Sequence, residues 1–129
     1  MDVYMNREAR IYLEGLAFIN SGLEGILIGH KRGHEYFIEQ VFPYHNTLSI
    51  TEGVFIKLNQ HFEDRIVGFY AFLPDNKRAK NILVPYTAGK VFLRVDMDKE
   101  RGISLDYFFI DYDETFCLKP IEKFRFKKD

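Results

Sequence analysis

Residues 66–74 have the sequence IVGFYAFLP, the longest apolar run in the chain. The run is much too short to cross a membrane as a helix, and its β-branched and aromatic residues favour a strand. A strand without a polar face is covered on both sides and lies inside a sheet. The sequence therefore predicts a central strand over residues 64–72, around which the other elements are arranged.

The elements before this strand follow from capping residues, turns and apolar spacing. Asn6 can cap one helix, and Thr51 or Ser49 can cap a second, because these side chains accept hydrogen bonds from the first helical turn. Between the two helices, residues 23–30 and 35–42 are rich in apolar residues and are separated by a turn. This pattern predicts a hairpin.

The elements after the central strand give shorter signals. Strands are expected at residues 82–84, 91–95 and 105–110, with polar turns between them. The tail then alternates in the way typical of a half-exposed edge strand, and its apolar members are Phe116, Leu118, Phe124 and Phe126. We therefore expect residues 1–129 to form one α/β (α+β) domain, with a single mixed β-sheet flanked by a helix on each side.

Length and composition limit the classes of protein that fit. The chain has 129 residues, enough for one domain with a core, and 47% hydrophobic residues argue against disorder. Eighteen Lys and Arg against 19 Asp and Glu give a net charge of −1, so neither general nucleic-acid binding nor membrane association is expected. The single cysteine, Cys117, cannot form an intramolecular disulfide, and no signal-like N-terminus is present. Both features predict a cytoplasmic protein.

Two stretches together resemble the JAMM/MPN domain family. Residues 25–29 are GILIG and residues 67–74 are VGFYAFLP, where the family typically has Glu-x-x-Gly-Leu-x-Leu-Gly and Val-Gly-Trp-Tyr-His-Ser-His-Pro. The resemblance covers roughly residues 6–111 and implies an MPN/cytidine-deaminase-like sandwich. The active members of this family are zinc isopeptidases or related peptidases.

The residues that carry the family's chemistry are replaced in this chain. The resemblance places the general base on Gly22, and the two zinc-binding histidines on Ala71 and Leu73. The serine between these histidines falls on Phe72, and the downstream serine and aspartate fall on Asn81 and Val84. Catalytic zinc needs three protein ligands, and the side chains at the three ligand positions are apolar here. We therefore expect no metal, no cofactor and no zinc catalysis at this site.

The resemblance then implies a catalytically inactive MPN-like domain that acts as a protein-interaction or structural module, with a protein partner or as a homodimer. An alternative from a different class is a small-molecule-binding protein or hydrolase with a rebuilt, zinc-free site. Its candidate residues are Glu24, Tyr70 and Asp75. A structural role is nevertheless favoured for Glu24, as a carboxylate near solvent at the beginning of its strand. An acid that lacks both a metal and a base partner cannot by itself catalyse a reaction.

Other polar residues receive structural interpretations. His30 and His34 flank the predicted hairpin turn, where solvent-exposed histidines are more common than metal ligands. The basic loop over residues 77–80 is expected to be solvated, since no glycine-rich phosphate loop opens a helix there. Cys117 has no histidine near it in sequence and is expected to be a packing residue.

Overall fold

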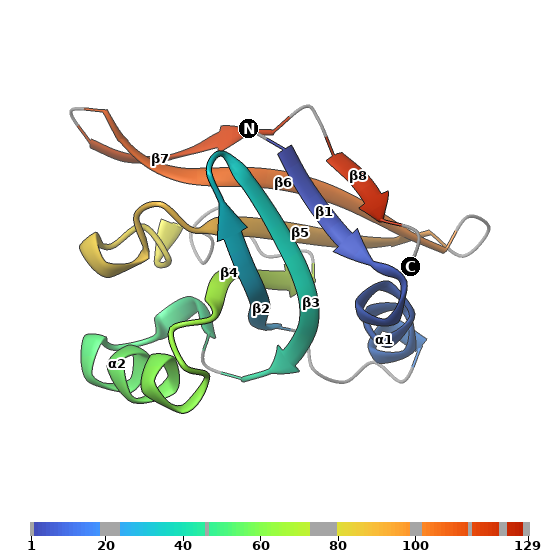
Figure 1. Ribbon diagram of the computed structural model, residues 1–129, viewed down its shortest axis with the longest axis horizontal. Coiled ribbons are helices and arrows are strands. Elements are labelled where there is room, and N and C mark those ends of the chain that lie inside the picture. Colours follow the sequence, from blue (N-terminus) through green and yellow to red (C-terminus); the bar gives the residue numbers. More distant parts are fainter. Residues whose placement is uncertain are drawn as a thin grey trace.

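The structure is a computed structural model that describes residues 2–18, 24–45, 47–72, 80–98, 102–113, 115–121 and 124–127. These residues contain helices α1 (Arg7–Phe18) and α2 (Glu52–His61) and two short 3-10 helices, Thr47–Ser49 and Pro85–Thr87. The strands are β1 (Asp2–Asn6), β2 (Glu24–Arg32), β3 (Glu35–Pro43), β4 (Ile66–Phe72), β5 (Val91–Asp98), β6 (Gly102–Asp113), β7 (Thr115–Pro120) and β8 (Phe124–Lys127) (Figure 1).

The strands form one mixed sheet in the order β7-β6-β5-β4-β2-β3-β1-β8. β4 lies inside this sheet, antiparallel to β2 and parallel to β5. Every residue from Ile66 to Ala71 is buried, so the prediction of a central strand is confirmed. The predicted hairpin is also present, as the antiparallel pair of β2 and β3.

Both predicted helix caps are present. The Asn6 side chain accepts a hydrogen bond of 2.8 Å from the backbone N–H of Ala9, at the beginning of α1. The Thr51 side chain accepts one of 3.3 Å from the N–H of Val54, at the beginning of α2. Each cap satisfies a backbone donor that the helix itself leaves without a partner.

The sheet curls strongly. Tyr36 on β3 and Phe109 on β6 have ring centroids 6.4 Å apart, although three strands separate β3 from β6 in the sheet order. In a flat sheet these strands would be about 19 Å apart, at about 4.8 Å for each neighbouring pair. The hydroxyl of Tyr36 also donates a hydrogen bond of 2.6 Å to the carbonyl oxygen of Gly89, before β5. The inner face of the sheet therefore closes on itself around one core.

The predicted sandwich of a sheet flanked by helices is wrong. The chain is mostly strand, and its one sheet forms a curled half-barrel. Phe55 is the one fully buried residue of the short helix α2. The core on that side is completed by residues of a 3-10 helix and of loops, namely Leu48, Ile50 and Ile82. The curl of the sheet and the loops thus cover the apolar surface of the sheet. In a layered sandwich, helices would cover this surface. The same finding corrects the sandwich that the family resemblance implies.

Three further expectations differ from the structure. Residues 82–84 are not a strand, because they lead into the 3-10 helix that begins at Pro85, and proline cannot donate to a ladder. β1 was not predicted, since five residues are too few for a clear alternation. The alternating tail forms two strands rather than one, and β7 and β8 lie at opposite edges of the sheet.

Candidate binding groove

Ala71, where the resemblance places the first zinc ligand, lies in an apolar cluster. Ala71 is 2% exposed and packs in the cluster that contains Phe69 and Ile82. Across the sheet it is paired with Glu24 of β2. The positions Gly22 and Leu73 lie outside the described residues. The described part of this region therefore carries a methyl group where the resemblance would place an imidazole.

The other described positions that the resemblance assigns lie on β4 and in the segment before the second 3-10 helix. Phe72 ends β4 and packs against the inner core, with its ring at the edge of the Tyr70 ring, 6.1 Å between centroids. Asn81 is exposed, and Val84 is half-buried ahead of the 3-10 helix. The backbone N–H of Val84 donates to the hydroxyl of Thr87, so this segment is held by local hydrogen bonds.

Glu24 is buried, which contradicts the expectation that it lies near solvent. Its exposed fraction is 5%, and it lies in the first position of β2. Cross-strand partners share a sheet face, so Glu24 lies on the same face as Ala71 of β4, which is covered by an apolar cluster. Asp75 lies outside the described residues, so the structure describes two of the three residues of the alternative site.

Tyr70 is fully buried on the inner face of the sheet. Its hydroxyl has no hydrogen-bond partner among the described residues. Burial raises the pKa of Tyr70, and the nearby Tyr12 and Glu24 raise it further. Tyr70 and Glu24 are thus close enough to interact electrostatically. Neither of them lines the groove described below.

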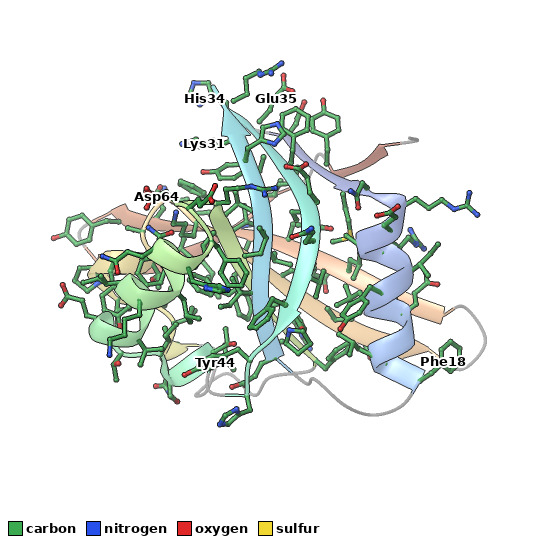
Figure 2. The ribbon with its side chains drawn as sticks, turned by 60° about the horizontal axis from the view of Figure 1, so that its bottom comes forward. Phe18, Lys31, His34, Glu35, Tyr44 and Asp64 are labelled. Atoms are coloured by element: carbon green, nitrogen blue, oxygen red, sulfur yellow. The ribbon has the colours of Figure 1, made fainter. Side chains whose placement is uncertain are left out.

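The two turn histidines are exposed, as expected. His34 lies at the tip of the β2–β3 hairpin, where Figure 2 labels it beside Glu35. His30 approaches the carboxylate of Glu39 with its Nδ1 atom at 2.7 Å and stacks on the ring of Phe37. The described residues contain no group of three or more metal-ligating side chains. Cys117 is half-buried on β7.

The cluster of His30, Glu39 and Arg65 predicts a small pH dependence of stability. The hydrogen bond with His30 lowers the pKa of Glu39, and the guanidinium of Arg65 at 3.4 Å acts in the same direction. A carboxyl group whose pKa is lowered by folding stabilises the protein when the pH lies above the pKa of the unfolded chain. This contribution is lost as the pH falls through the pKa of the folded chain.

We therefore expect the free energy of unfolding to fall more for the wild type than for Glu39→Gln between about pH 5 and pH 3. The difference should stay below about 0.5 kcal/mol, because these side chains are exposed and screened. Urea denaturation at several pH values measures it. Parallel curves for the two proteins at low salt would show that the cluster does not stabilise the fold.

A groove of about 300 Å³ lies along β3. Figure 2 shows α1 running beside the lower half of β3, and these two elements are in contact. Ile28 of β2 and Phe62, just after α2, complete the lining, and the other residues are Glu8, Ala9, Tyr12, Glu39, Gln40, Val41 and Phe42. Two large apolar side chains in it are exposed, Tyr12 by 51% and Phe42 by 41%.

No pattern in the sequence predicted this groove. Tyr12 and Phe42 are 30 positions apart in the sequence, and only the path from β1 into α1 brings them to one place. A partial signal was present. Tyr12 is a large apolar residue beside the buried face of its helix, and Pro43 ends β3 with a residue typical of sheet edges.

Comparison with known proteins adds information on the fold alone. No family model and no curated protein matches this chain. The solution structure of protein DSY2949 from Desulfitobacterium hafniense is similar, with a TM-score of 0.66 and 13% sequence identity. The match covers 98% of this chain and 94% of that one. The curled, strand-rich architecture therefore occurs in another protein over the same length. Neither described helix is long and apolar enough to span a membrane.

Proposed function

We propose that this chain is a catalytically inactive domain that acts by binding another protein. The observation that carries the proposal is the groove along β3, with the exposed side chains of Tyr12 and Phe42. Large apolar side chains gathered in a depression are typical of protein interaction sites. The buried methyl group of Ala71 supports the inactive part of the proposal, because a methyl group cannot bind zinc.

The proposal also concerns the compartment. A cytoplasmic protein needs no disulfides, and the sequence has one cysteine, which is half-buried on β7. A partner in the cytoplasm would bind by noncovalent contacts, without a disulfide bond. We therefore infer that the groove works in a reducing environment.

Phe42→Asp is expected to abolish partner binding. A carboxylate in the groove would lose its hydration when a partner covers it, which costs several kcal/mol. The tagged chain, purified from its source cells, should bring down the same partner repeatedly, and the variant should not. Ile56→Asp is the matched control, because Ile56 is exposed by 47% on α2 and does not line the groove.

Two results would contradict the proposal. One is the recovery of no specific partner under several growth conditions. The other is near-stoichiometric zinc in protein purified without chelators, measured by elemental mass spectrometry, because catalytic zinc would make the chain an enzyme candidate. If both Asp variants kept the partner, the interaction would be real but would use another surface.

A further inference from the structure

The outer side of β3 loses its neighbouring strand halfway along its length. β1 pairs with β3 only as far as the pair Met5–Ile38, and the chain then enters α1 after Asn6. The pairing of β3 with β2 is irregular at the same point, where Glu39 is an extra residue between the partners of Ile28 and Gly29. Beyond this bulge, residues 40–43 have a strand neighbour on the β2 side only, within the described chain.

The backbone of this free edge points into the groove. The N–H of Tyr44 donates to the carbonyl oxygen of Glu24, so residue 44 faces β2. Because backbone groups alternate along an antiparallel strand, Phe42 also faces β2, and Val41 and Pro43 face away from it. The N–H and C=O groups of Val41 are thus directed to the open side. Pro43 lacks an N–H and fits this outward position, as prolines at sheet edges do.

The groove continues on both sides of the free edge. Side chains alternate along β3, so Val41 lies on the α1 side with Ala9 and Tyr12. Phe42 lies on the other side, where its ring packs against Phe62 with centroids 5.1 Å apart. A segment that added to this edge as a strand would place alternate side chains on these two apolar walls. A bound helix could not pair with the Val41 backbone groups, because its own backbone groups are hydrogen-bonded within the helix.

The charges of the groove lie at one end. Glu8 and Glu39 are its two ionisable acids, and no Lys or Arg lines it. Glu39 already interacts with His30 and Arg65. Glu8 is exposed in the first turn of α1, and no ion pair of this residue is present in the described chain. A Lys or Arg of a bound segment would therefore complement Glu8, and apolar residues would follow it toward Tyr12 and Phe42.

We propose that the partner binds as an extended peptide segment, which pairs with the edge of β3 at Val41 and places a basic side chain against Glu8. The inference rests on the proposed function and names the partner's binding element. Strand addition supplies backbone hydrogen bonds for affinity and uses the alternate side chains for specificity. The ligand class is thus an alternating apolar segment with a Lys or Arg at one end.

The first test selects ligands from a display library of short random peptides against the full chain. Enrichment of alternating apolar residues with a basic end and no central proline is expected. Enrichment of peptides with helical spacing or of proline-rich peptides would overturn the proposal, and so would the absence of any enrichment. Synthetic copies of a selected peptide then serve as the probe for the variants.

The variants separate strand addition from other contacts. Tyr12→Ala is expected to lower the affinity for the peptide at least about tenfold, as for an aromatic residue in a binding site. Ile11→Ala, on the same helix and 55% exposed but outside the groove, should change it less than about twofold. Glu8→Lys should lower the affinity about threefold at low salt, and added salt should remove the difference.

The decisive measurement is made on the peptide, so it does not depend on how a variant folds. N-methylation of the peptide amide that pairs with the Val41 carbonyl should lower the affinity at least about tenfold, since it removes an interfacial hydrogen bond and blocks close approach. Methylation of the next amide, which faces away, should be tolerated. Equal effects at both amides would overturn strand addition. If a cellular partner binds but the peptide results are negative, the proposed function stands and this inference fails.

Discussion

Gly29→Ala is expected to lower the free energy of unfolding by about 3 kcal/mol, at the upper end of the effect of overpacking in a tightly packed region. An ideal Cβ at Gly29 would lie 1.7 Å from the carbonyl oxygen of Phe37 on the neighbouring strand. The clash is with backbone, so no side-chain rotation can relieve it. It occurs beside the bulge between β2 and β3, where two backbones approach closely, and glycine is the residue that permits this.

The matched control is Gly15→Ala. Gly15 lies in α1, and an added Cβ would meet nothing within 4 Å. Alanine is the better helix former by about 1 kcal/mol, so this variant should be as stable as the wild type or more stable. Urea denaturation followed by circular dichroism compares the three proteins. A Gly29→Ala protein with the stability of the wild type would show that the two strands can separate at this point without cost.

Tyr36→Ala is expected to destabilise the protein by about 4 kcal/mol, the range for loss of a large buried aromatic side chain. Tyr36 is 1% exposed and contacts Phe109 across the curl of the sheet. Its hydroxyl also donates to the carbonyl oxygen of Gly89. The residue therefore joins β3 to the far half of the sheet by packing and by one hydrogen bond.

Tyr36→Phe separates the two contributions. It removes the hydroxyl alone and should cost about 1 kcal/mol, the usual net value of a hydrogen bond. Tyr12→Phe is its control, because the Tyr12 side chain is exposed by 51%, and it should stay within about 0.5 kcal/mol of the wild type. Denaturant midpoints of the four proteins provide the comparison. If Tyr36→Ala costs no more than Tyr36→Phe, the packing across the curl does not hold the sheet closed.

Local signals predicted most elements of this fold. The caps at Asn6 and Thr51 were predictable because a cap is a contact between residues three positions apart. The central strand was predictable because all its residues from Ile66 to Ala71 are buried, which leaves a continuous apolar run in the sequence. The hairpin of β2 and β3 followed from two such runs with a short turn between them.

Burial of polar residues could not be predicted in the same way. Glu24 was expected near solvent, since it stands at the beginning of a strand, yet it is buried on the covered sheet face that it shares with Ala71. The carbonyl oxygens of Ile82 and Val84 are the two acceptors within reach of the single hydroxyl proton of Thr87, which organises a turn where a strand was expected. Both outcomes depend on which segments become neighbours, and a hydropathy pattern does not contain that information.

The candidate groove shows the same limit for function. The loss of ligand-forming side chains at Ala71 and Leu73 is visible in the sequence, provided that the family resemblance is accepted. The edge at Val41 is not visible, because it exists only where β1 stops pairing with β3 and the chain turns into α1. Whether a residue lies at a sheet edge depends on which strands become neighbours, and the sequence of the strand itself does not specify this.

Local patterns were sufficient to predict both helix caps, the β2–β3 hairpin and the buried strand at 66–72, because these depend on contacts within a few residues or on one face of a segment. The strand order, and the curl that brings Tyr36 to Phe109, became visible in the folded chain alone. The same holds for the free edge at Val41. These features arise from pairings between distant segments, where the free energy depends on how the whole sheet packs and twists.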